Sequence, residues 1–179
     1  EEAMQDAQVS VDQEDPIRCG VVYGSGMGGV HTLDVNIGGF GAGDGTPRYS
    51  PFFVPMIITN MAAGMLAIRY GFQGVNFATT SACSSSAHAI ANAYYQIRMG
   101  LADIIITGGS EAAVECCGIG GFNALHALST RNESPQTASR PFSASRDGFV
   151  LGEGAGTLIL EEYEHAKARG AHIYAELVG

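Results

Sequence analysis

The chain has 179 residues, which is enough for one domain with a substantial hydrophobic core. Its formal net charge of −9 excludes a nucleic-acid-binding function, because no basic surface is present to neutralise phosphates. The uncharged run over residues 51–68 approaches membrane-spanning length, but it contains two prolines and Asn60, so we expect no membrane segment.

The distribution of charge is uneven along the chain. Charged residues make up 15% of the total, against roughly 25% in ordinary globular domains. Residues 51–130 contain only five of them: Arg69, Arg98, Asp103, Glu111 and Glu115. A domain wetted on all sides needs a more polar surface, so we expect further protein, either another subunit or additional chain, to cover this section.

The first elements are an acidic segment and a strand. Six acidic residues lie within residues 1–15, and we expect this segment to be a solvated surface. Residues 17–24 predict a strand that leads into Gly24-Ser25-Gly26-Met27-Gly28-Gly29, which matches the G-x-G-x-x-G dinucleotide fingerprint. That fingerprint requires a helix and a second strand ending in an acid. Because residues 36–47 predict a glycine-rich loop before and around Asp44, we expect a tight turn and no nicotinamide or flavin cofactor.

The middle of the chain alternates strands and helices. Strand 102–109 is apolar on both faces, which indicates a parallel sheet with helices on both sides, and the fold class is α/β. The predicted elements here are an extended segment over 50–55, a helix over 56–70, a strand over 74–79, a helix over 84–99 and a strand over 102–109.

The remainder is shorter and more polar. The predicted elements are a helix over 118–128, a polar loop over 129–140, two strands joined by a glycine turn over 147–160, a charged helix over 161–169 and a further strand over 172–178. We expect that last strand to continue in chain that is absent here.

Cys83 lies at the turn between the predicted strand 74–79 and the helix 84–99. Its sulfur is therefore expected near free backbone N–H groups and the positive end of a helix dipole, where a thiolate is stabilised. The same strand–turn–helix arrangement forms the nucleophile elbow of hydrolases, in which N–H groups also stabilise an oxyanion. A small buried hydrophobic cysteine is the alternative interpretation.

A nucleophilic cysteine needs more than a helix dipole, which contributes at most about 2 kcal/mol, and a nearby histidine or other cation would supply the rest. None of the five histidines is a convincing partner. His88 follows Cys83 by five residues, about 140° further round an α-helix, and is expected to point elsewhere. Cys116 and Cys117 lack the strand-to-turn setting and are interpreted as structural. No cysteine spacing predicts a metal site, and without a signal peptide we expect reduced thiols in a cytoplasmic protein.

Several stretches together resemble the β-ketoacyl-(acyl-carrier-protein) synthases, most of all the type II elongating enzymes of bacterial fatty acid synthesis. The resemblance extends from about Ile17 to Gly179. It is carried by residues 50–55 (SPFFVP), 81–85 (SACSS), 107–112 (TGGSEA), 127–132 (ALSTRN), 140–142 (RPF) and 146–156 (RDGFVLGEGAG).

The resemblance implies a thiolase-like fold, in which two similar α/β halves stack as five αβαβα layers and function as a homodimer. Residues 1–179 would form the N-terminal half, without the first strand region and without the C-terminal half. It further implies transfer of an acyl chain from acyl carrier protein to Cys83, followed by decarboxylative condensation with malonyl carrier protein, with no cofactor.

By the same resemblance, the Cys83 N–H donates to the oxyanion, and Phe122 and Phe53 line the substrate channel, although plain core packing is the alternative for both phenylalanines. The catalytic histidines and lysine of the family lie in the absent half, so we expect the chain alone to be inactive. Alternatives are a polyketide-type ketosynthase, a thiolase-type acyltransferase, a non-catalytic chain-length factor, which would normally lack the cysteine, and a dinucleotide-binding module.

Overall fold

The computed structural model describes residues 1–179, which divide into two compact units. The first unit comprises Glu1–Met27, Ile58–Glu111 and Ala155–Gly179, and it contains the sheet and Cys83. The second comprises Gly28–Ile57 and Ala112–Gly154, and it is helical with long connections.

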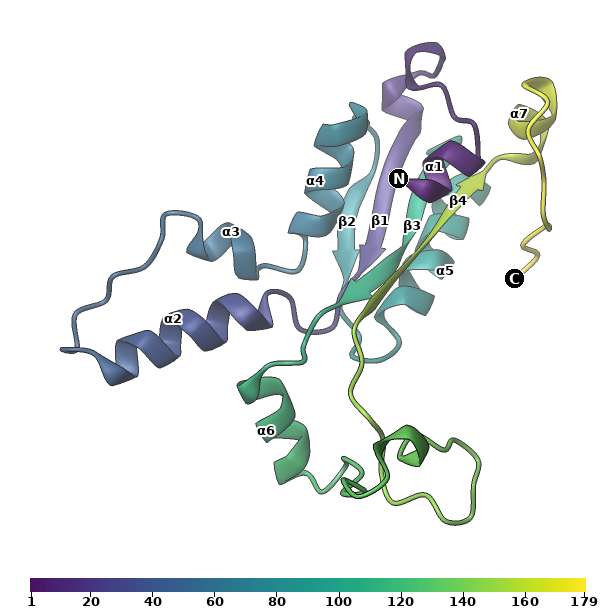
Figure 1. Cartoon of the computed structure of the whole chain (residues 1–179). Helices are drawn as coiled ribbons and strands as arrows, with labels where there is room; N and C mark the ends of the chain where they lie inside the picture. The colour runs from purple at the N-terminus through teal and green to yellow at the C-terminus, as the bar shows by residue number, and fades with distance from the viewer. The chain divides into compact units, whose positions relative to one another are not determined.

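The sheet has four strands in the order β2-β1-β3-β4, formed by Asn76–Thr79, Cys19–Gly24, Ile104–Glu111 and Gly154–Glu161. β1 is parallel to both neighbours, so that Val21 pairs with Asn76 on one side and with Ile106 on the other. β4 runs in the opposite direction along β3, because the Glu162 N–H donates to the Asp103 carbonyl while Gly156 lies against Gly108 (Figure 1). The sheet is therefore mixed.

Helices cover both faces of this sheet, as the apolar strands predicted (Figure 1). Alternate strand residues point to opposite faces. Val21 and Ile106 pack against α4 (Met61–Tyr70), and Val22 and Ile105 pack against α5 (Ser85–Arg98). Ala89 and Ala93 of α5 are fully buried, and their small side chains allow the helix to approach the sheet closely. The helix predicted over 84–99 is confirmed.

The N-terminal segment is more ordered than the sequence suggested. Residues Glu2–Asp6 form α1, and its Met4 is buried in the core beside α4. Two 3-10 turns, Val11–Gln13 and Pro16–Arg18, then lead into β1. The acidic segment is thus a partly packed element, since one apolar side chain anchors it.

A network of charged side chains joins this segment to the end of β4 and to α7 (Tyr163–Ala168). The Arg169 guanidinium donates to both carboxylate oxygens of Glu161, at 2.6 and 2.7 Å, and to the Ala7 carbonyl at 2.9 Å. His165 lies between the same Glu161, at 2.7 Å, and Glu14, at 3.1 Å. The partly buried charges of Glu161 and Arg169 are therefore paired with opposite charges and hydrogen-bonded.

The second unit contains α2 (Val30–Ala42), α3 (Phe53–Ile57), α6 (Cys116–Ala124) and a 3-10 turn at Pro135–Thr137. α2 corrects the prediction that residues 36–47 form a loop before and around Asp44. The glycines that weaken its second half continue a helix started by residues 30–37, and the Asn36 side chain donates to the Thr32 carbonyl at 2.8 Å.

Other boundaries also differ from the predictions. The helix expected over 56–70 is divided into α3 and α4 by the β-branched Ile58 and Thr59 region, and the helix expected over 118–128 spans 116–124. Only one strand forms within residues 147–160, because Phe149 makes an isolated bridge to Leu128 instead of pairing in a sheet. Residues 172–178 form no strand, since no neighbouring strand pairs with them.

Candidate functional site

Cys83 lies on a tight turn between β2 and α5, as the sequence predicted. β2 ends at Thr79, and α5 begins at Ser85 with Ser84 as its N-cap residue. Cys83 and Ser81 form an isolated bridge across the turn. The thiol is free and exposed, and it precedes a helix of 14 residues. The positive end of the α5 dipole and the strand end therefore meet at the sulfur.

The turn stores backbone strain at Ala82, whose φ is +50°. A left-handed conformation costs an L-residue roughly 1–2 kcal/mol, and such strain persists only where surrounding contacts hold it. Ser85 supplies two of these contacts, because its buried hydroxyl donates to the Ala82 carbonyl at 2.7 Å and accepts from the Ser81 N–H at 2.8 Å. The Thr79 hydroxyl donates to the Ser85 carbonyl at 2.7 Å.

The Cys83 N–H takes part in none of the hydrogen bonds that hold the turn. Ser84 and Ser85 direct their own N–H groups back to Ser81 and Ala82, at 3.1 Å each. An unpaired N–H beside an exposed sulfur is the arrangement that can stabilise negative charge on a carbonyl oxygen attacked by that sulfur.

The other cysteines lie in different environments. Cys19 is buried in β1, and burial raises the pKa of its thiol to about 12. Cys116 and Cys117 are exposed at the start of α6. Partial desolvation, together with the nearby Asp34 carboxylate, raises the pKa of Cys117. Cys19 and Cys117 are thus biased against the thiolate form.

The histidines have partners that the sequence did not reveal. His31 pairs with Glu115 at 2.6 Å, and the His172 ring packs edge-on against Tyr174. Burial lowers the pKa of His165, but the hydrogen bond to Glu161 and the charge of Glu14 outweigh it and raise the pKa overall. The His88 ring lies 2.7 Å from the Ser81 hydroxyl, beside the turn that carries Cys83, and makes no hydrogen bond to the cysteine itself.

Phe122 and Phe53 both lie in the second unit. Phe122, on α6, is half-buried and packs edge-on against Phe149 with ring centroids 5.4 Å apart. Phe53, the first residue of α3, stacks on Tyr49 at 4.7 Å. Each ring therefore belongs to an aromatic pair, and neither is a fully buried core residue.

The glycine loop after β1 is held by the Glu111 carboxylate. This carboxylate accepts hydrogen bonds from the N–H groups of Gly26, at 2.7 Å, and Met27, at 3.2 Å. These are donors that a cofactor phosphate would need. No strand lies between α2 and β2, so Asp44 does not end a second strand. The loop instead packs beside the Cys83 turn, since a Cβ added at Gly26 would lie 3.4 Å from the Ala82 carbonyl oxygen.

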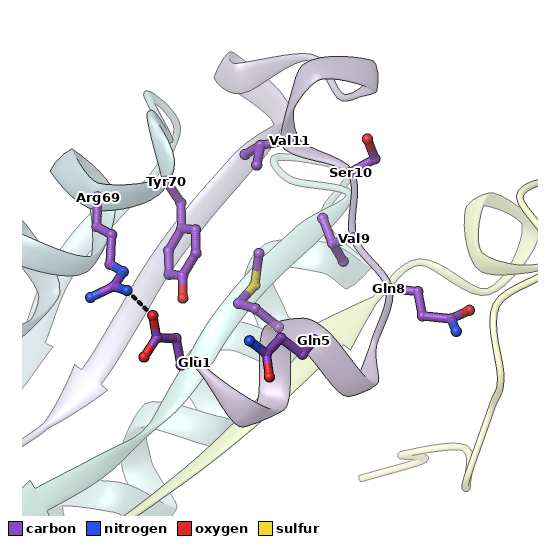
Figure 2. Close-up of a pocket in the computed structure, with 9 residues that line it drawn as sticks. Glu1, Gln5, Gln8, Val9, Ser10, Val11, Arg69 and Tyr70 are labelled. Carbon is purple, nitrogen blue, oxygen red and sulfur yellow. Dashed lines mark hydrogen bonds and ion pairs between the residues drawn. The ribbon is translucent and has the colours of Figure 1, made fainter.

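Figure 2 shows the hollow between α1 and α4, of about 490 Å³, where Arg69 pairs with Glu1. It contains no cysteine or histidine and is therefore not where Cys83 chemistry can occur. No group of three or more His, Cys, Asp or Glu side chains in the structure could hold a metal ion. None of the helices has the length and apolar character needed to span a bilayer.

The fold and the turn at Cys83 define an α/β protein with a cysteine in a nucleophile-elbow setting. A family model described as the N-terminal domain of β-ketoacyl synthase matches residues 1–166. The chain belongs to the β-ketoacyl synthase family, and the fold is thiolase-like, as the resemblance implied.

Curated relatives agree with this assignment. The chain is 49% identical to 3-oxoacyl-[acyl-carrier-protein] synthase 2 of Vibrio cholerae over 178 residues, which cover 99% of the chain and 43% of the relative. It is 46% identical to the mitochondrial 3-oxoacyl-[acyl-carrier-protein] synthase of Arabidopsis thaliana, covering all of the chain and 39% of that protein. The chain thus spans less than half the length of these relatives.

Solved structures give the same fold. A β-ketoacyl synthase from Burkholderia phymatum superposes with a TM-score of 0.80 at 35% identity, covering 95% of this chain and 43% of that one. A type II polyketide ketosynthase, solved in complex with its acyl-carrier protein, gives a TM-score of 0.82 at 38% identity and covers 98% of this chain and 44% of that one.

Proposed function

We propose that this chain provides the nucleophile of a β-ketoacyl-(acyl-carrier-protein) synthase that elongates fatty acids. The observation that carries the proposal is the exposed, free Cys83 on a strained turn before α5, with an unpaired N–H beside it. Family membership and the names of the curated relatives support the reaction class.

In the first step, the Cys83 thiolate attacks the thioester carbonyl of an acyl carrier protein. The electron pair of that carbonyl moves onto its oxygen, where the Cys83 N–H donates a hydrogen bond to the oxyanion. The carbonyl then re-forms, the carrier thiolate leaves, and the acyl group remains on the sulfur. Cys83 lies just before the N-terminus of α5, where the helix dipole favours negative charge.

In the second step, a malonyl carrier protein loses carbon dioxide, and the electron pair of the broken bond remains on the α-carbon of the thioester. That carbon attacks the acyl carbonyl on Cys83, which forms the new carbon–carbon bond. The Cys83 thiolate is then expelled, so the nucleophile is regenerated and the product is a 3-oxoacyl carrier protein. Neither step requires an oxidant, a metal or a cofactor from this chain.

The groups that promote decarboxylation are proposed to come from the part of the relatives that this chain does not span. No histidine of the chain makes a hydrogen bond or ion pair with Cys83, and the dipole alone provides at most about 2 kcal/mol. We further infer that Phe122 and Phe53 line the acyl channel, because both rings remain partly open to solvent within their aromatic pairs.

Partners and location follow from the same assignment. Acyl carrier protein is the proposed carrier of both substrates, supported by the neighbour solved in complex with its own carrier protein. A homodimer is proposed because large apolar side chains such as Phe52, Ile68 and Leu125 are more than 65% exposed in the chain alone. We place the protein in the cytoplasm, where its four free cysteines would remain reduced.

A polyketide-type ketosynthase is the second candidate, because a type II polyketide ketosynthase superposes with a TM-score of 0.82 and a ketosynthase/chain length factor structure with a TM-score of 0.85. Their identities of 38% and 29% are lower than the 49% of the Vibrio cholerae synthase, so fatty acid elongation is preferred. A chain-length factor is disfavoured by the presence of Cys83, and a thiolase-type enzyme by the residues that follow Arg146.

The test is acyl transfer to the full-length protein that carries this chain, with radiolabelled acyl carrier protein as donor. We expect Cys83→Ala to abolish both acylation and 3-oxoacyl product, and Cys116→Ala, an exposed cysteine on α6, to leave both unchanged. The isolated 179-residue chain should give no product. Acylation that persists in Cys83→Ala would refute the proposed nucleophile, and product from the isolated chain would refute the division of the catalytic groups.

A further inference from the structure

His88 lies on α5, in contact with the turn that carries Cys83, and the proposed reaction gives it no role. Its Nδ1 is 2.7 Å from the Ser81 hydroxyl oxygen. Cys83 precedes α5, and the chain before the helix brings Ser81 against it. The residue two positions before the cysteine therefore meets the second turn of the helix.

Ser81 is held by α5 and the adjoining turn through all of its polar groups. Its N–H donates to the Ser85 hydroxyl at 2.8 Å, and its carbonyl accepts from the Ser84 N–H at 3.1 Å. Its own hydroxyl makes the contact with His88. Because a hydroxyl can donate or accept, this contact suits either tautomer of the neutral imidazole ring.

These contacts surround the strained residue. Ala82, with φ +50°, lies between Ser81 and Cys83, and relaxation of its backbone would rotate the peptide that carries the Cys83 N–H. Ser85 restrains Ala82 through its carbonyl, on the side of α5 that is buried. His88 restrains Ser81 from the exposed side. The turn is thus held by two restraints: Ser85, which is buried, and His88, which is exposed.

We propose that His88 is a positioning residue for Cys83, which acts through the Ser81 hydroxyl to hold the turn in its strained conformation. The inference rests on the proposed function, in which Cys83 accepts the acyl group. His88 touches neither the sulfur nor the oxyanion position, so it sets the orientation of Cys83 and transfers no proton. Loss of the contact lets Ala82 relax and moves the Cys83 N–H away from the oxyanion.

The experiment measures two rates in the full-length protein: alkylation of Cys83 by iodoacetamide, and acyl transfer from acyl carrier protein. His88→Ala and Ser81→Ala should each slow both reactions by about three- to tenfold, the effect expected from one lost hydrogen bond. The double variant should be no slower than either single variant, because both changes remove the same contact. The KM for the carrier protein should stay unchanged while kcat falls.

Conservative variants separate positioning from general damage to the fold. His88→Asn retains a polar nitrogen near the position of Nδ1 and should recover most of the rate, as should Ser81→Thr, which retains the hydroxyl. His172→Ala is the matched control, since His172 is an exposed histidine of the same unit that packs on Tyr174 and not on the turn. Its rates should equal those of the unaltered protein.

Unchanged rates in His88→Ala, or additive losses in the double variant, would overturn the positioning role. If His88→Ala fails to fold, the comparison of His88→Asn with Ser81→Ala still decides the question. A His88→Asn protein that reacts as slowly as Ser81→Ala contradicts the proposal. Failure of the proposed function is distinguishable: acylation would then persist in Cys83→Ala, while the alkylation rates would still report on the turn.

Discussion

Gly24, the last residue of β1, lies directly beneath the Cys83 turn and leaves no space for a side chain. A Cβ at this position would lie 2.5 Å from the Ser85 carbonyl carbon and 2.6 Å from both the Ser85 oxygen and the Ser86 nitrogen. Ordinary contacts of a carbon atom lie near 3.5–4.0 Å. Gly24→Ala therefore forces β1 and the start of α5 apart by about 1 Å.

Neither side of this contact can move easily. β1 pairs with β3 along its whole length and with β2 from Val21 to Gly24, and the atoms that the new methyl group would meet are backbone atoms of α5. Overpacking of a rigid core costs about 1–3 kcal/mol, and we expect the upper end of that range. Because Ser85 holds Ala82, the displacement should also slow alkylation of Cys83.

The measurement is urea-induced unfolding of the full-length protein, followed by the iodoacetamide rate. Gly64→Ala is the matched control, since Gly64 lies within α4 of the same unit and, apart from its chain neighbours and the backbone of its own helix, no atom comes within 4 Å of its added Cβ. That control should unfold at higher urea, because alanine favours a helix interior by about 0.5–1 kcal/mol over glycine. A Gly24→Ala protein with an unchanged midpoint and rate would refute the close approach as the cause.

Two further predictions concern the network at the end of β4. Arg169→Ala leaves the Glu161 carboxylate, whose side chain is 9% exposed, without its guanidinium partner. We therefore expect the free energy of unfolding, measured in urea, to fall by about 3 kcal/mol. A decrease below about 1 kcal/mol would contradict the buried pairing. Burial raises the pKa of Glu161, but hydrogen bonds from Arg169 and His165 outweigh it and lower the pKa overall. Its stabilisation is therefore complete above the unfolded value of about 4.3 and is lost as the pH falls through the lowered pKa. The pKa of His165 is raised, so its stabilisation is complete below the unfolded pKa of about 6.5 and is lost as the pH rises through the pKa of the folded state. Urea midpoints that do not change with pH in either of these two ranges would contradict the pairing of Glu161 with His165.

The sequence predicted those elements whose pattern is local. The apolar runs of β1 and β3 and the helical spacing of α5 predicted these elements to within two residues at each end, and the strand–helix turn at Cys83 followed from them. A strand exists only where a partner strand lies beside it. For this reason the sequence could not predict that residues 147–160 form only one strand and that residues 172–178 form none.

The candidate site shows the same limit more sharply. Cys83 could be found because its setting is formed by consecutive residues. Glu111 could not, since its role depends on β3 lying beside β1, which brings its carboxylate to the N–H groups of Gly26 and Met27. The contact of His88 with the Ser81 hydroxyl could not be predicted either, because it depends on the path of the chain before the first residue of α5.

The strand order also has a consequence during synthesis. β1 is translated first, but its neighbours are β2 and β3, and Cys19 pairs with Ile104. At about 5–20 residues per second, the ribosome needs roughly 4–17 s to make the intervening chain. β2 and α5 are made earlier within that interval, so the edge of β1 that faces β3 is the last to find its partner. The Cys83 turn can thus form only after β2 and α5 have been made, and β1 is enclosed last, when β3 pairs with its second edge.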